Sequence, residues 1–186
     1  MLFRSPRDRD TFTPTAWRLL AYGVSTGAID AKEGNVLVAR LMKDLANHPD
    51  LTLECLQRFM VAIDHKDVAA RQKIFRGAYA LYAKRPDLQI RLRLLQCEEL
   101  VAAGQQPEAL TIALQTCTDN AKEGSLILSL VDYVVKASKE FNATNPKFQL
   151  GVVRQALAKI EKDFPQKRGD TVSAAYEEFK GMVGRL

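Results

Sequence analysis

The sequence contains few side chains of the kinds that bind metal ions. His48 and His65 both stand in predicted turns, and the only local cluster of ligand types is Asp64-His65-x-Asp67. A structural zinc site gathers four ligands, usually from closely spaced His, Cys or carboxylate residues. We interpret the cluster as a turn that caps a helix, and we predict no metal ion and no cofactor.

Adjacent carboxylates occur twice, as Glu98-Glu99 and Glu177-Glu178. Two carboxylates in one site can act as general acid and base, but consecutive residues of a helix point about 100° apart. Neither pair therefore shares a site. The sequence also lacks a phosphate-binding loop, a dinucleotide fingerprint and a nucleophile elbow. We predict that the protein is not an enzyme, and a site assembled from scattered residues is the alternative.

The three cysteines, Cys55, Cys97 and Cys117, are odd in number and include no C-x-x-C pair. Each falls on a predicted apolar helical face, where a thiol acts as a small hydrophobic group. Such cysteines are typical of a reducing compartment, and we expect the cytoplasm. No apolar run approaches the ~20 residues that a membrane-spanning helix requires, so we expect no membrane partner.

Basic residues are concentrated between residues 66 and 93. This segment carries eight Lys and Arg residues against two Asp residues, for a net charge of +6 in a chain of net charge +5. At 100° per residue, Lys73, Arg76 and Lys84 share one face of a predicted helix, whereas Arg71 points elsewhere. The predicted basic patch consists of Lys73, Arg76, Lys84, Arg85 and Arg93. It could bind phosphates or an acidic peptide, and the alternative is a solvated face.

Residues that end one helix and begin the next recur along the chain. Pro49 and Pro86 stand 37 residues apart, and Gly124 follows 38 residues later, each followed directly by Asp or Ser. Pro14 precedes this series by 35 residues and Pro165 follows it by 41. Proline disfavours the helical conformation in the residue before it, and Asp or Ser caps the helix that comes next. This period leaves room for two helices and a turn, so it predicts helical hairpins.

Apolar residues at helical spacing mark the two helices of each hairpin. Gly27 and Gly104 are predicted to end first helices, Asp30-x-x-Glu33 resembles a capping box, and Pro107 suits the first turn of a second helix. The predicted buried faces include Trp17, Ala21, Val24, Leu41, Leu45, Leu56, Met60, Ile74, Ala78, Leu81, Ile90, Cys97, Val101, Leu110 and Ala113.

The most apolar predicted helix runs from Leu126 to Phe141, and its pattern indicates burial between neighbouring helices. Asn145-Pro146 is predicted to open its partner helix. We expect Asp170 to cap a final helix that carries Val172 and Phe179. An unpaired terminal helix of this kind would cover the exposed end of a stack of hairpins.

The third hairpin contains the pattern Leu100-x-x-x-Gly104-x-x-x-Glu108-Ala109-Leu110. This pattern resembles the first helix, glycine turn and start of the second helix of a tetratricopeptide repeat. Pro86 stands where the terminal proline of a preceding repeat is expected. The resemblance covers about one repeat and is faint over the other three.

This resemblance implies an all-α fold, a right-handed solenoid of about four antiparallel helix hairpins plus a C-terminal capping helix. It also implies a concave groove that binds peptides or partner helices. The positions carried over to this groove are Glu54, Gln57, Arg91, Glu98, Asp132 and Lys136. The alternative is that these residues are ordinary solvated surface.

We predict a flexible charged lead-in over residues 1–12 and a single repeat domain over residues 13–186. The leading functional hypothesis is a non-catalytic scaffold that binds a protein or peptide in the concave groove. Arg91 and Lys136 would then anchor acidic groups of the partner. The alternative hypothesis is a nucleic-acid-binding helical adaptor that uses the basic segment 66–93.

Overall fold

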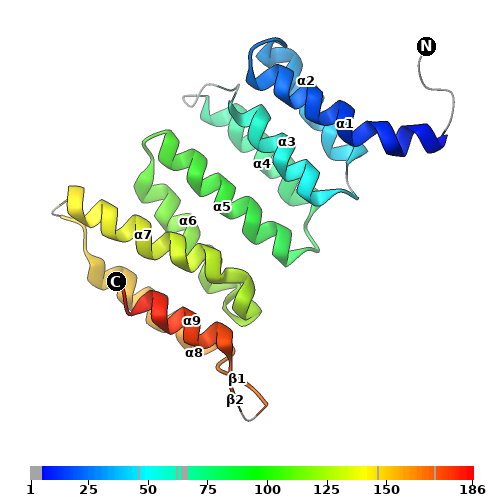
Figure 1. Cartoon of the computed structure of the whole chain (residues 1–186). Coiled ribbons are helices and arrows are strands. Elements are labelled where there is room, and N and C mark those ends of the chain that lie inside the picture. Colours follow the sequence, from blue (N-terminus) through cyan, green and yellow to red (C-terminus); the bar gives the residue numbers. More distant parts are fainter. Residues whose placement is uncertain (1–5, 46, 62, 64–66, 146, 170) are drawn as a thin grey trace. The chain divides into compact units, whose positions relative to one another are not determined.

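The computed structural model describes residues 6–45, 47–61, 63, 67–145, 147–169 and 171–186, except for the side chains of residues 6–13, 31–36, 39 and 68. Within these ranges the chain is all-α, apart from two strands of two residues each (Figure 1). In this described part no helix combines the length and the apolar character that crossing a membrane requires.

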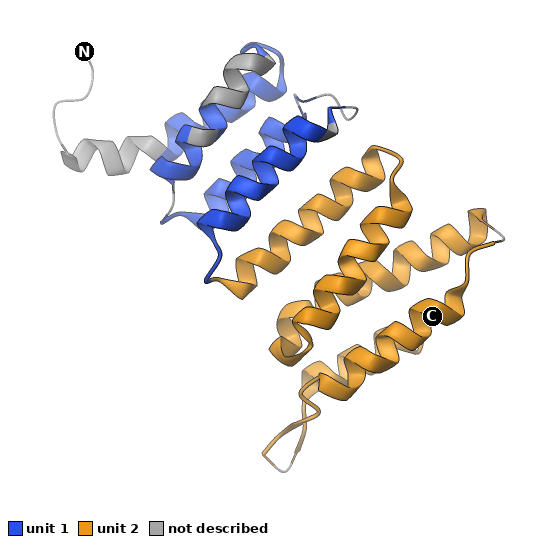
Figure 2. Ribbon diagram, turned by 180° about the vertical axis from the view of Figure 1, so that it is seen from behind, with its two compact units in different colours: residues 1–84 blue, residues 85–186 orange. Residues whose placement is uncertain are grey.

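The chain divides into two compact units, residues 1–84 and residues 85–186, coloured separately in Figure 2. We expected one repeat domain over residues 13–186, and we describe the two units one at a time. Unit 1 is formed by α1 (Pro6–Ser25), α2 (Ala31–Asp44), α3 (Pro49–Val61) and α4 (Val68–Leu81). In it α1 packs against α2 and α3, and α2 packs against α3 and α4.

The beginning of unit 1 differs from the sequence prediction. Helix α1 starts at Pro6, so residues 6–12 of the expected lead-in are helical, and residues 1–5 lie outside the described part. Pro14, which we grouped with the residues that separate helices, lies inside α1. The helix ends at Ser25, before Gly27, whose φ of 75° is a conformation that favours glycine. Trp17, Ala21 and Val24 are buried as predicted.

The junction between α3 and α4 is held by two polar side chains. Asp67 caps α4 by accepting a hydrogen bond from the Ala70 backbone N–H at 3.0 Å. Arg71 is 5% exposed and donates from Nη2 to the carbonyl oxygens of Met60 and Ile63, both at 2.6 Å. The rest of the predicted Asp64-His65-x-Asp67 turn, residues 64–66, lies outside the described part. Further along α4 our prediction for Leu81 was wrong, because this residue is exposed.

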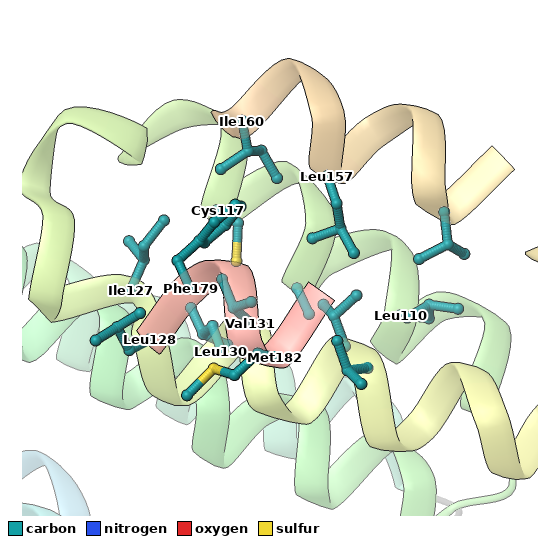
Figure 3. Packing of buried hydrophobic residues seen from close by; sticks show 14 of the residues in the cluster. Leu110, Cys117, Ile127, Leu128, Leu130, Val131, Leu157, Ile160, Phe179 and Met182 are labelled. Atoms are coloured by element: carbon teal, nitrogen blue, oxygen red, sulfur yellow. The ribbon is translucent and has the colours of Figure 1, made fainter. Parts of the chain in front are cut away.

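Unit 2 contains five α-helices within the described residues, and each is followed by a turn or a short element. They are α5 (Pro86–Ala102), α6 (Gln106–Asp119), α7 (Leu128–Thr144), α8 (Leu150–Asp163) and α9 (Ala174–Val183). Helix α6 packs against α5, α7 and α8, and α7 packs against α9. Figure 3 shows the shared core, in which Phe179 and Met182 of α9 lie beside Leu130 and Val131 of α7.

The predicted stops between the helices of unit 2 are present. Gly104 has a φ of 77° between α5 and α6, and Pro107 lies in the first turn of α6. Gly124, with a φ of 57°, lies in a 3-10 helix, η1 (Ala121–Ile127), which leads into α7. Helix α7 therefore begins at Leu128, two residues later than predicted. Val101, which we predicted on the buried face of α5, is 38% exposed.

The C-terminal segment contains a hairpin that we did not predict. Strand β1 (Lys167–Arg168) pairs antiparallel with β2 (Thr171–Val172), and α9 begins only at Ala174. Val172 was predicted on the final helix, but it lies in β2 and is 52% exposed. Asp170, the predicted cap, lies outside the described part, and Ser173 occupies the capping position of α9. The prediction that Phe179 is buried was correct.

Candidate functional site

A solvent-facing hollow of about 570 Å³ lies among α5, α6 and α7 of unit 2. Helix α7 supplies Tyr133, Lys136, Ala137, Glu140, Phe141 and Thr144 to its lining. This spacing of three and four residues places them on one side of α7. Val101 of α5 and Gln106 and Leu110 of α6 complete the lining. We call the hollow formed by these nine residues the Tyr133 groove.

The packing of α7 explains why this side of the helix is available. Leu130, Val131, Val134 and Val135 point into the core, where they are buried. Tyr133 and Phe141 lie off this core-facing stripe and are only partly buried. The Phe141 ring meets the Phe148 ring edge-on, with centroids 4.9 Å apart. The helix therefore presents aromatic surface to the groove in addition to the surface that it buries in the core.

The floor of the Tyr133 groove is mainly apolar. Val101 stands at the end of α5, and Leu110 lies one turn into α6, so the Gly104 turn brings both residues to the same place. A hollow of this size with an apolar, partly aromatic lining is typical of sites that bind ligands or partner side chains. A single exposed valine on a protein surface needs no explanation. Val101, however, lines the same hollow as Tyr133 and Phe141, and contiguous apolar surface of this kind often marks an interaction site.

Tyr133 lines this groove and carries a hydroxyl group. This hydroxyl is buried and forms no hydrogen bond within the described residues. Burial raises the pKa of Tyr133 to about 12, and the nearby Cys97 thiol and the carboxylates of Glu98 and Glu140 add to this effect. The carboxylates of Glu98 on α5 and Glu140 on α7 are therefore both close enough to act electrostatically on this one phenol.

Charges around the groove are unevenly paired. Lys136 lies next to Asp132, with Nζ and Oδ2 2.6 Å apart, and Arg185 Nη2 lies 3.3 Å from Asp132 Oδ1. By contrast, Glu98 and Glu140 form no ion pair within the part of the chain that the structure describes. Burial raises the pKa of Glu98, because a carboxylate loses hydration there.

The groove residues predicted from the resemblance are only partly gathered at this hollow. Lys136 lines it, Asp132 pairs with Lys136, and Glu98 acts on Tyr133. Arg91 is exposed on α5 and does not line the hollow. Glu54 and Gln57 belong to α3 of unit 1, and Glu54 Oε2 lies 3.1 Å from Arg18 Nε.

The predicted basic patch is divided between the two units. Lys73 and Arg76 are exposed on α4 and Lys84 follows that helix, whereas Arg85 and Arg93 belong to unit 2. Arg85 Nη2 donates to Asp87 Oδ2 at 2.8 Å, and this hydrogen bond lowers the pKa of Asp87. Arg93 is half-buried and donates to Gln96 Oε1 at 2.9 Å. Arg85 and Arg93 therefore engage neighbouring side chains.

Sequence reasoning missed most of the groove lining. Val101 and Leu110 were predicted as core, and Tyr133, Glu140 and Phe141 were not considered as site residues. The available signal was that α7 carries large aromatic residues outside its core-facing stripe. Their function as a lining depends on where α5 and α6 lie, which the pattern of one helix does not specify.

The three cysteines are buried thiols, as predicted. The Cys97 thiol donates a hydrogen bond to the Ala109 carbonyl oxygen at 3.3 Å, across the α5–α6 pair. Burial raises the pKa of Cys97 and of Cys117 to about 12. Both thiols are thus protonated at neutral pH, which makes them poor nucleophiles.

Within the described ranges, no group of three or more His, Cys, Asp and Glu side chains is arranged to hold a metal ion. Comparison with known proteins gives no relative: no family model, no curated protein and no solved structure matches the chain.

Proposed function

We propose that the protein is a non-catalytic interaction module whose Tyr133 groove binds a peptide or helix of a partner protein. The observation that carries this proposal is the apolar hollow of about 570 Å³ among three helices of unit 2. Partner helices and peptides bind in such grooves by inserting apolar side chains between helices. Aromatic residues at the floor supply large contact areas at a low cost in side-chain entropy.

The proposed fold is a stack of helical hairpins, and the helix packing within each unit is what such a stack requires. In unit 1, α1 packs against α3 and α2 against α4; in unit 2, α5 packs against α7 and α6 against α8. Contacts between alternate helices arise when successive hairpins stack with the same orientation. A right-handed solenoid with α9 as its terminal cap would use the faces of α5 and α7 as a concave binding surface.

A peptide display selection on the immobilised chain tests this function. We expect the enriched peptides to lose binding at least about ten-fold to a Val101→Gln variant, because the amide would be covered by the bound peptide without a hydrogen-bond partner. The matched control is Val152→Gln, which places the same amide on an exposed valine of α8 outside the groove. Selection of no peptide, or equal loss with both variants, would overturn the proposal.

A second function, binding of a nucleic acid or another polyanion, is favoured by one contact in unit 1. A Cβ atom at Gly77 of α4 would lie 3.3 Å from Met42 Sδ of α2, so the two helices approach closely there. Lys43 follows Met42 and Arg76 precedes Gly77, and both basic side chains are exposed. Lys73, one turn before Gly77, extends this surface.

Retention on an oligonucleotide column at increasing salt tests the second function. Phosphate binding predicts a steep fall of affinity with salt, because each contact releases counterions. Replacement of Lys73 and Arg76 by Glu should abolish retention, and unchanged retention would exclude this surface.

The buried thiols support a reducing compartment such as the cytoplasm for either function.

A further inference from the structure

The charge of the Tyr133 groove indicates which kind of segment would bind there. Lys136 is the cationic side chain of the lining, and it is already paired with Asp132 at 2.6 Å. Glu140 lines the groove from α7, and Glu98 approaches Tyr133 from α5. The lining from α6 adds the uncharged side chains of Gln106 and Leu110. Arg185 shares Asp132 with Lys136, so the charged side chains in and beside the described groove are two cations and three carboxylates, a net charge of −1 beside an apolar lining.

This arrangement differs from the one that we expected from the sequence. Arg91 and Lys136 were predicted to anchor acidic groups, but Arg91 lies outside the lining and Lys136 is already paired with Asp132. An acidic segment would bring further negative charge close to Glu98 and Glu140. Like charges in a partly desolvated site repel each other, so such a segment is disfavoured there.

A long basic side chain complements both the shape and the charge of this groove. Lysine and arginine carry three or four methylene groups that pack on apolar surface while the charged end remains at the rim. Val101 and Phe141 offer such a surface, and the ring faces also attract cations. The charged end would then reach Glu98 or Glu140, and it would offset the unfavourable desolvation of Glu98.

We propose that the segment bound by the Tyr133 groove is a peptide of a partner protein that combines apolar residues with Lys or Arg. This inference rests on the proposed function, because it specifies the partner of the same site. The apolar side chains fill the space above Val101, Leu110 and Phe141, and the basic side chains pair with Glu98 and Glu140.

Two labelled peptides test the charge preference by fluorescence anisotropy on the full chain. One is a 14-residue amphipathic Leu–Lys peptide, and the other carries Glu in place of every Lys. The Leu–Lys peptide should bind at least about ten-fold more tightly than the Leu–Glu peptide. The chain has a net charge of +5, so its overall field favours the Leu–Glu peptide, and the expected preference must come from the groove.

Charge-neutral variants locate the interaction. E98Q/E140Q should weaken binding of the Leu–Lys peptide about five-fold, as expected for two partly exposed ion pairs. E177Q/E178Q removes two exposed carboxylates from α9 and changes the net charge equally, so it is the matched control. Its affinity should stay within about two-fold of the parent value. Circular dichroism verifies that both variants are folded.

The outcomes separate this inference from the proposed function. Tighter binding of the Leu–Glu peptide, with loss of that binding in Val101→Gln, would refute the cationic partner and retain a peptide-binding groove. Equal effects of E98Q/E140Q and E177Q/E178Q would also refute the inference. If neither peptide binds but display selection yields groove-dependent peptides without Lys or Arg, only the inference fails. If the selection also fails, both are wrong.

Discussion

The buried guanidinium of Arg71 is expected to be one of the main stabilising groups of unit 1. Its Nη2 atom donates to two carbonyl oxygens, those of Met60 and Ile63, at the end of α3. The last carbonyls of a helix have no partner within that helix, and a positive charge near them interacts favourably with the helix dipole. Arg71 thus satisfies the end of α3 and attaches α4 to it.

Replacement of Arg71 by Met should cost about 3 kcal/mol of the free energy of unfolding. Each of the two hydrogen bonds from the charged guanidinium contributes about 1.5–3 kcal/mol, and removal of the buried charge returns part of the sum. A unit of 84 residues has a stability of roughly 4–13 kcal/mol, so the loss is large. With a urea dependence of about 1.5 kcal/mol per molar, the unfolding midpoint should fall by about 2 M.

Trp17 provides the assay, because it is the single tryptophan of the chain and is 4% exposed in α1. Its fluorescence during urea unfolding reports on unit 1. The matched control is Arg76→Met on the same helix, where the exposed arginine makes only a long hydrogen bond of 3.4 Å to the Gln72 carbonyl. The control should change stability by less than about 0.5 kcal/mol. A midpoint for Arg71→Met within about 0.3 M of the control would refute the reasoning.

Three further predictions concern unit 2. Tyr133→Phe should leave the free energy of unfolding unchanged or raise it by about 1 kcal/mol, because the buried hydroxyl has no partner among the described residues. Urea unfolding monitored by circular dichroism tests this, and a lower unfolding midpoint than that of the parent would contradict it. Gly181→Ala should stabilise α9 by about 0.5–1 kcal/mol, whereas Gly104→Ala, at a φ of 77°, should destabilise unit 2. Shifts of the melting temperature in the same direction for both variants would contradict this prediction. Burial raises the pKa of Cys97 and Cys117 from 9.0 to about 12. Above about pH 9 the two thiols therefore ionise only in the unfolded chain, and the free energy of unfolding should fall as pH rises from 9 to 11. Urea midpoints at these pH values should fall less steeply in a Cys97→Ala/Cys117→Ala variant, and an identical slope would contradict the assignment.

Helix boundaries were the most predictable part of the fold, because they depend on a few neighbouring residues. Pro86, Gly104 and Pro107 mark starts and stops correctly, since each restricts the backbone within its own turn. Pro14 shows the limit of this reasoning. The residues before it continue as a helix in α1, although proline disfavours that conformation locally.

Burial was less predictable than helix position. Helical spacing shows which residues share a face, but another helix must cover that face before its residues are buried. Val101 shares a face with Cys97, which is buried, yet Val101 lies at the end of α5 and lines the groove. Val172 was assigned to a helix because its neighbours fit that period, whereas it lies in a hairpin of two two-residue strands that precedes α9. Short strands leave too little pattern to be recognised.

The distribution of charge shows why a linear sequence was a poor guide to the partner. Residues 66–93 are rich in basic side chains, but Arg71 is buried as a helix cap, and Arg85 and Arg93 bond to neighbouring side chains. The negative charge at the groove comes instead from Glu98 and Glu140, which stand 42 residues apart on different helices. The proposed partner is therefore a basic peptide, whereas the sequence alone suggested an acidic one. A search for the partner should therefore use cationic, apolar segments as bait.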